Sequence, residues 1–195
     1  MKLVLASGNP GKLREISALL APLGHKLVAQ ATLGIASPAE TGATFTENAL
    51  LKARHAARHA RLPALADDSG IEVDALGGRP GVHSARYAGP QATDRENLEK
   101  MLIELQGKEQ RVARYQCVIV LVRTADDPKP LVATGSWSGR ILQAPRGSRG
   151  FGYDPVFLPD GSKLSAAELE PLEKNRHSHR AQALRALVDQ LQWQS

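Results

Sequence analysis

Short apolar runs alternate along this chain with segments of helical periodicity. The runs at 2–6 and 25–30 have the length of buried strands, and 12–23 repeats apolar residues at the spacing of one helix face. The later run 111–123 is rich in Val, Ile and Leu and predicts a long strand. Turn residues at 125–130 connect it to 131–141, which predicts a hairpin. The pattern predicts strands that alternate with helices.

Helix starts are marked by three sequences of the Ser/Thr-x-x-Glu type, which is typical of a capping box. They lie at 44–47, 93–96 and 165–168. The first opens an alanine-rich segment, and we expect a helix over about 45–61. A basic stretch at 174–180 leads into a closing amphipathic helix.

The most unusual stretch is an apolar run, 62–66, that leads directly into Asp67 and Asp68 and then into glycine-rich sequence. Adjacent side chains on a strand point to opposite faces, so both carboxylates cannot bind one ion while the strand stays regular. A hard cation such as Mg²⁺ would need further oxygen ligands. The nearest candidates are Glu40, Glu72 and Asp74. Asp-Ser-Gly is also a common turn sequence. Taken alone, the Asp67-Asp68 pair favours the simpler interpretation, which is a turn.

Between the first strand and helix lies the loop Ser7-Gly-Asn-Pro-Gly11, followed by Lys12. A helix N-terminus exposes unpaired N–H groups, so Ser7, Gly8, Asn9 and Lys12 together could bind phosphate oxygens. The spacing excludes a P-loop, because two residues separate the glycines where that motif has four. A plain cap formed by Asn9 and Pro10 is an equally open alternative.

A second glycine-rich loop, 146–157, places glycines on both sides of Phe151. These glycines allow the backbone to approach a ligand, and Phe151 could stack on a flat base. A hairpin loop whose aromatic residues cover the core explains the same sequence. The basic stretch at 174–180 is a second candidate anion site.

Composition narrows the class of protein. The 195 residues, 42% of them hydrophobic, suit one compact domain, with two lobes as an alternative. The net charge of +5 implies an anionic partner, whereas 4% aromatic residues argue against a base-stacking nucleic-acid surface. No run reaches the length of a membrane span or a signal peptide, and the single Cys117 cannot form an internal disulfide, so we expect a cytoplasmic protein.

Seven short motifs together resemble the inosine/xanthosine triphosphate pyrophosphatase family. They are Ser7-Gly-Asn-Pro-Gly-Lys12, Glu40-Thr-Gly, Ala66-Asp-Asp-Ser-Gly-Ile-Glu-Val, Gly77-Gly-Arg-Pro-Gly, Ser84-Ala-Arg-Tyr, Gly150-Phe-Gly-Tyr-Asp-Pro155 and Ser178-His-Arg180. Each is weak alone, but their order and spacing cover nearly the whole chain.

The resemblance implies hydrolysis of ITP, dITP and XTP to the monophosphate and pyrophosphate, with Mg²⁺ as cofactor, by one domain spanning 1–195. It implies an α/β fold, in which a long mixed central sheet is flanked by helices in two lobes with a nucleotide cleft between them. It also implies a homodimer that forms no stable complex with nucleic acid or membrane.

The resemblance also assigns roles to the motif residues. Asp68 would be the general base and, with Glu40, a magnesium ligand. Substrate would be bound by the phosphate loop Ser7, Gly8, Asn9, Pro10, Gly11 and Lys12, by Ser69, by the purine wall Phe151, Gly152, Tyr153 and Asp154, and by the base-reading residues Lys174, His179 and Arg180. Two alternatives remain. The first is a related pyrophosphatase with another aberrant nucleotide as substrate, and the second is a nucleic-acid-binding module that uses the basic face of 54–61 and the closing helix.

Overall fold

The computed structural model describes residues 2–21, 24 and 26–192. Leu23 and His25, which belong to the predicted first helix and second strand, lie outside the described residues. The strands are β1 (Lys2–Leu5), β2 (Lys26–Ala29), β3 (Ala64–Val73), β4 (Val112–Val122), β5 (Leu131–Ile141) and β6 (Phe157–Pro159). The helices are α1 (Pro10–Leu20), α2 (Phe45–Ala60), α3 (Asp94–Glu104), α4 (Pro171–His177) and α5 (His179–Gln192).

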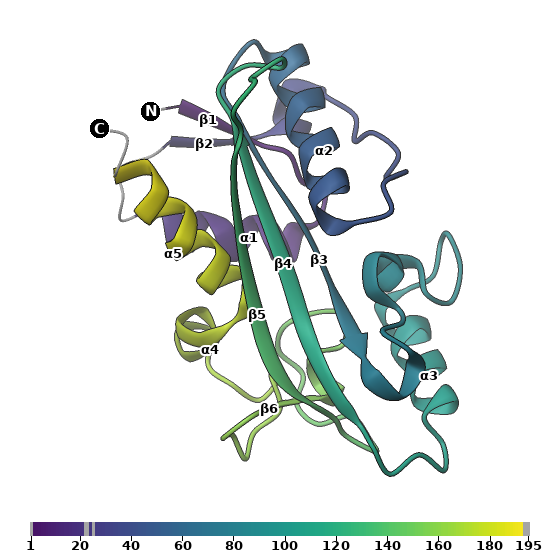
Figure 1. Cartoon of the computed structure of the whole chain (residues 1–195). Helices are drawn as coiled ribbons and strands as arrows, with labels where there is room; N and C mark the ends of the chain where they lie inside the picture. The colour runs from purple at the N-terminus through teal and green to yellow at the C-terminus, as the bar shows by residue number, and fades with distance from the viewer. Residues whose placement is uncertain (1, 22–23, 25, 193–195) are drawn as a thin grey trace. The chain divides into compact units, whose positions relative to one another are not determined.

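The strands form one sheet in the order β2-β1-β3-β4-β5-β6 (Figure 1). Strand β1 is parallel to β2 and to β3, whereas β6 is antiparallel to β5, so the sheet is mixed. The predicted α/β fold with a mixed sheet and flanking helices is confirmed. None of the described helices is long and apolar enough to span a bilayer.

The chain forms two compact units, each built from separate segments. Unit 1 consists of residues 1–68, 117–135 and 179–195, and unit 2 of residues 69–116 and 136–178. The division passes through β3 between Asp68 and Ser69.

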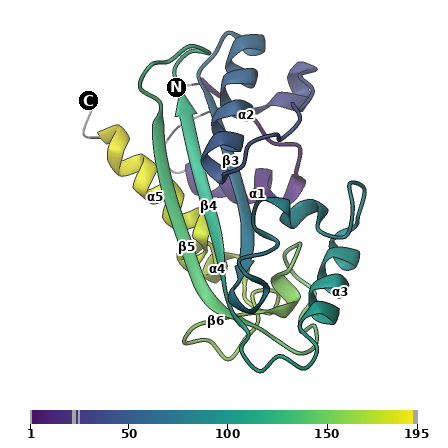
Figure 2. The same cartoon turned by 45° about the vertical axis from the view of Figure 1, so that its right-hand side comes forward.

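Unit 1 is layered because its strands alternate their side chains between two apolar clusters. On β1, Leu3 and Leu5 pack with residues of α1 and α5, whereas Val4 and Ala6 pack with the alanines of α2. Strand β3 follows the same rule, since Leu65 joins the first cluster and Ala64 and Ala66 join the second. Figures 1 and 2 accordingly show α5 and α2 on opposite sides of β4.

Unit 2 has its own core around the remaining parts of the long strands. Helix α3 contributes Leu98 and Met101, which pack with strand residues such as Ile71 and with the aromatic Tyr153 and Phe157. The predicted capping box is present at its start, where Thr93 Oγ1 accepts from the Glu96 N–H and Glu96 accepts from the Thr93 N–H.

One alternative and one local prediction from the sequence are wrong. The stretch Asp67-Asp68-Ser69-Gly70, for which a turn was the simpler alternative, lies inside β3. The helix expected to begin at 165–168 is only a turn there, although Glu168 does accept from the Ser165 N–H. Pro171 explains the second error, because the residue before a proline avoids helical geometry and Glu170 is extended, so α4 begins after it.

Arg111 connects the end of α3 to the end of β5 within unit 2. Its guanidinium donates to the carbonyl oxygens of Leu105, Ile141 and Leu142 at 2.8–2.9 Å. Arg111→Ala is expected to lower the free energy of unfolding by about 1–3 kcal/mol in a urea titration, because three carbonyl groups lose their donor. Arg95→Ala, which removes an exposed arginine of α3, is the control and is expected to leave the urea midpoint unchanged. Equal midpoints for the two variants would contradict this role of Arg111.

Candidate active site

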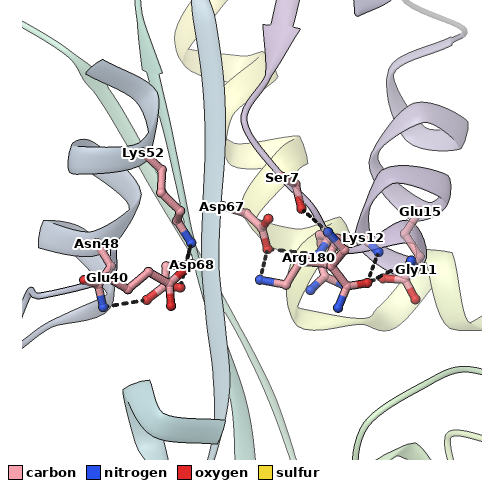
Figure 3. Close-up of polar contacts among 11 residues, drawn as sticks. Ser7, Gly11, Lys12, Glu15, Glu40, Asn48, Lys52, Asp67, Asp68 and Arg180 are labelled. Carbon is pink, nitrogen blue, oxygen red and sulfur yellow. Dashed lines mark hydrogen bonds and ion pairs between the residues drawn. The ribbon is translucent and has the colours of Figure 1, made fainter. Parts of the chain in front are cut away.

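The two adjacent carboxylates of β3 point to opposite faces of the strand, as predicted (Figure 3). Asp67 lies on the α1 and α5 side with Leu65, and Asp68 lies on the α2 side with Ala66. Both residues are almost fully buried. They therefore belong to two different polar clusters of unit 1.

On the α2 side, Lys52 joins two carboxylates. Its Nζ lies 2.9 Å from Asp68 Oδ1 and 2.6 Å from Glu40 Oε1. Asn48, one turn earlier on the same helix face, donates from Nδ2 to Asp68 Oδ2 at 3.2 Å. Helix α2 thus fixes both oxygens of Asp68, and we name Glu40, Asn48, Lys52 and Asp68 the Asp68 cluster.

The loop that carries Glu40 is fixed by the start of α2. Asn48 Oδ1 accepts from the Gly42 N–H at 2.8 Å, and the Thr44 and Glu47 capping box is complete. A Cβ atom at Gly42 would lie 2.8 Å from Asn48 Oδ1 and 2.7 Å from Glu47 Cβ, so only glycine fits this approach. The close contact between Gly42 and Asn48 holds the preceding loop against α2, where Glu40 contacts Lys52.

Burial and charge act in opposite directions on these groups. Burial, the largest influence, raises the pKa of Asp68 above its ordinary value, although Lys52 and Lys12 oppose it. Burial would lower the pKa of Lys52, but Asp68, Asp67 and Glu40 outweigh it and raise that pKa. Lys52 therefore stays charged beside a carboxyl group that accepts a proton more readily than an exposed aspartate.

On the other face of β3, Asp67 binds two cations. Lys12 Nζ lies 3.0 Å from Asp67 Oδ2, and Arg180 Nε lies 3.4 Å from the same oxygen. Arg180 also donates from Nη1 to Glu15 of α1. Burial would raise the pKa of Asp67, but Lys12, Arg180 and Lys52 outweigh it and hold the pKa below its usual range. We name Lys12, Glu15, Asp67 and Arg180 the Asp67 cluster.

The loop before α1 is a helix cap in this structure. Asn9 Oδ1 accepts from the N–H groups of Gly11 and Lys12 at 2.8 and 3.1 Å, and Pro10 occupies the first helical position. Ser7 Oγ accepts from the Asn9 N–H at 3.2 Å. The cap holds the loop in one conformation with Lys12 next to Asp67.

In unit 2, Asp154 is the centre of a third cluster. Its Oδ2 accepts from Lys174 Nζ at 2.6 Å and from the Phe151 N–H at 2.9 Å, and Tyr115 donates to Oδ1 at 3.3 Å. The ammonium of Lys174 lies 5.1 Å from the centre of the Phe151 ring. Asp154 and Lys174 are buried, so they fix the backbone and one face of Phe151.

Residues 3–190 match the family model described as the Ham1 family. The chain belongs to the Ham1 family. Among curated Ham1 relatives, a protein of Methylococcus capsulatus named dITP/XTP pyrophosphatase is 59% identical over 192 residues, covering 97% of this chain and 96% of the relative. One of Yersinia pestis with the same name is 56% identical, covering 97% and 98%.

Solved Ham1 structures agree with the fold. The HAM1 protein of Coxiella burnetii superimposes with a TM-score of 0.91 at 48% identity and 98% coverage of both chains. The Ham1 protein of Staphylococcus aureus gives 0.88 at 36% identity and full coverage of both. The family resemblance of the sequence motifs is confirmed.

The Ham1 motif residues fall into both units. Unit 1 contains the loop and helix start 7–12, Glu40, Asp68, His179 and Arg180. Unit 2 contains Ser69, Lys174 and residues 150–154, which we name the Phe151 loop. Of the carboxylates considered for a metal, Glu40 alone among the three lies beside Asp68. Glu72 and Asp74 pair instead with Arg114, at 3.0 and 3.1 Å.

Sequence reasoning missed four contributors to these clusters: Glu15, Asn48, Lys52 and Asp67. The family motifs assign no role to Lys52 or to Asp67. The available signal was the four-residue spacing of Asn48 and Lys52, which places them on one face of the predicted helix. Nothing in the sequence indicates the partners of Glu15.

Glu40 and Asp68 fit a magnesium ion in the chemistry of their donors. Both carboxylates contact one cation, the Lys52 ammonium, so the two oxygen donors lie near one another. Among the described residues there is no group of three His, Cys, Asp or Glu side chains arranged for a metal. Two carboxylates nevertheless suit Mg²⁺, which commonly takes its other ligands from water and substrate phosphates.

Proposed function

We propose that this chain hydrolyses the deaminated purine nucleotides ITP, dITP and XTP to the monophosphate and pyrophosphate, which removes aberrant purines from the nucleotide pool. The proposal is carried by the Asp68 cluster, a buried carboxylate and an ammonium fixed side by side, in a chain 59% identical to a relative named dITP/XTP pyrophosphatase. The same proposal includes a single pyrophosphatase domain over 1–195, a homodimer and a cytoplasmic location.

Asp68 is the proposed general base. Its carboxyl group accepts the proton of the attacking water, and no covalent intermediate with the protein is needed. Burial favours this role because it raises the pKa of Asp68 toward the pH at which the enzyme works. Asn48 and Lys52 orient the two oxygens, which limits the positions from which water can be deprotonated.

Lys12 and Lys52 supply positive charge for the triphosphate. An ammonium group has three donors, so Lys12 can contact Asp67 and a phosphate oxygen at the same time. Ser7, Gly8 and the capped start of α1 complete the proposed phosphate loop, with Asn9, Pro10 and Gly11 fixing its shape. Charge placed before the reaction stabilises the leaving pyrophosphate without reorganisation.

Glu40 and Asp68 are the proposed ligands of Mg²⁺, which when bound would neutralise phosphate charge and polarise the bond to be cleaved. In their present positions both carboxylates contact Lys52, whose positive charge holds them close together. Asn48 and Gly42 then maintain the position of each carboxylate.

The purine is assigned to the Phe151 loop and to the base-reading residues. Phe151 stacks on the base, and Gly152, Tyr153 and Asp154 complete that wall, while Lys174, His179 and Arg180 donate hydrogen bonds. Hypoxanthine and xanthine present an acceptor oxygen at C6, whereas adenine presents an amino donor. A site built from buried donors can reject the mismatched base by roughly 10⁴–10⁵-fold, because the wrong base leaves donors unpaired.

The direct test is pyrophosphate release from ITP, dITP, XTP, ATP and GTP, with Mg²⁺ and with EDTA. We expect release from the three deaminated nucleotides alone, and we expect EDTA to abolish it and excess Mg²⁺ to restore it. Release that is equal for ATP and ITP would contradict the assigned selectivity. Turnover that persists in EDTA would contradict the magnesium role of Glu40 and Asp68.

A further inference from the structure

The Phe151 loop is held by two carboxylates that come from different elements. Asp154 Oδ2 accepts from the Phe151 N–H at 2.9 Å, and Asp94 Oδ2 accepts from the next amide, that of Gly152, at 2.7 Å. Asp154 belongs to the loop itself, whereas Asp94 is the first residue of α3 and lies 58 residues earlier in the chain. In the sequence Asp94 appears only as the second residue of the capping-box motif 93–96, with no role of its own.

The side chain of Asp94 is not needed to cap its own helix. Thr93 and Glu96 form the capping box, and each accepts from the backbone N–H of the other. Behind this end, Leu98 and Met101 anchor α3 in the core of unit 2. The Asp94 carboxylate is therefore not used to cap α3 and can accept from Gly152 instead. Because α3 is packed into the core, this hydrogen bond holds Gly152 in a fixed position.

The same helix fixes the segment that lies against Tyr153. Asn97, which is buried, accepts from the Ala88 N–H at 2.7 Å and donates to the Ala85 carbonyl at 3.2 Å. In that segment the Ser84 carbonyl accepts from the Tyr153 hydroxyl at 2.8 Å. Helix α3 thus fixes the Phe151 loop in two ways. Asp94 accepts from Gly152 directly, and Asn97 holds the segment 84–88, whose Ser84 carbonyl accepts from Tyr153.

We propose that Asp94 is a positioning residue for purine binding, which presents the Phe151 ring in one orientation by holding the Gly152 amide. The proposal rests on the assignment of Phe151 to the purine in the proposed function. Without this bond the loop samples more conformations, and the cost of ordering it is then added to each binding event. The Ser84 carbonyl adds a second constraint, because it accepts from the hydroxyl of Tyr153, the residue that follows Gly152.

The test compares Asp94→Ala with Asp94→Asn, because asparagine keeps an oxygen that can accept from Gly152. We expect Asp94→Ala to raise the KM for ITP by about 5- to 20-fold with kcat changed less than about twofold, and Asp94→Asn to restore most of the affinity. Glu99→Ala removes another exposed acid of α3, one that pairs with Arg95, and is expected to leave both constants unchanged.

Hydrogen exchange of the peptide covering 150–154 gives a second readout that is independent of turnover. We expect faster exchange in Asp94→Ala than in the wild type, and near-normal exchange in Asp94→Asn and Glu99→Ala. An unchanged KM in Asp94→Ala, or equal effects of alanine and asparagine, would overturn the proposal. If the wild type did not hydrolyse ITP, the proposed function would fail, and unchanged exchange in Asp94→Ala would separately show that Asp94 does not hold the loop.

Discussion

Asp68→Asn is expected to lower kcat for ITP by about 10²–10⁴-fold, the range lost when a general base is removed. Asparagine has nearly the same shape and can still accept from Lys52 Nζ, which lies 2.9 Å from Asp68 Oδ1, so the fold should persist. What disappears is the group that accepts the proton of water. Single-turnover measurement of pyrophosphate release, with circular dichroism as a check on folding, makes the comparison.

Glu72→Gln is the matched control for this experiment. Glu72 is a carboxylate of the same strand, but it contacts Arg114 rather than the Asp68 cluster. We expect its kcat to equal that of the wild type. If Asp68→Asn kept more than about a tenth of the activity, the loss would be smaller than the usual range and Asp68 would not be the base.

Arg180→Ala is expected to destabilise the protein by about 3–5 kcal/mol, because it removes one partner from a buried ionic network. Arg180 is 1% exposed and is the shared partner of Asp67 and Glu15. After the substitution Asp67 keeps Lys12, but Glu15 loses its contact with the guanidinium. Urea unfolding followed by circular dichroism measures the change.

Arg185→Ala, an exposed arginine on the same helix, is the control and is expected to shift the urea midpoint little. Comparable midpoints for both variants would show that the Asp67 cluster does not stabilise the fold. The base-reading role of Arg180 needs Arg180→Lys, which keeps the charge but has no planar fork. An unchanged preference for ITP over ATP in that variant would argue against this role.

The sequence predicted well what local chemistry determines. The capping boxes at Thr44 and Thr93 specify where two helices begin, and the structure confirms both. The alternation of side chains along a strand correctly separated Asp67 from Asp68. The alternative of a turn at Asp-Ser-Gly is wrong, because pairing within the sheet outweighs the local preference of these residues.

The contacts between distant residues could not be predicted in the same way. Arg180 meets Asp67 across 113 residues and Glu15 across 165, and no periodicity relates such positions. To predict the Asp68 cluster, one would have to know only how α2 is positioned along β3. The apolar pattern of α2 shows which helix face is buried, but not which residues of that face lie opposite Asp68. The role of the loop at Gly8 and Asn9 in phosphate binding stays a prediction, because the helix cap explains its geometry equally well.

The discontinuous composition of unit 1 has a consequence for synthesis on the ribosome. Its three segments end at residues 68, 135 and 195, whereas unit 2 is complete once residue 178 has been made. Until α5 emerges from the exit tunnel, Asp67 lacks Arg180, and Leu3, Leu65 and Leu121 lack the apolar face that covers them. The segment 1–68 must therefore wait for residues 179–195 before its core is complete, whereas unit 2 can fold earlier.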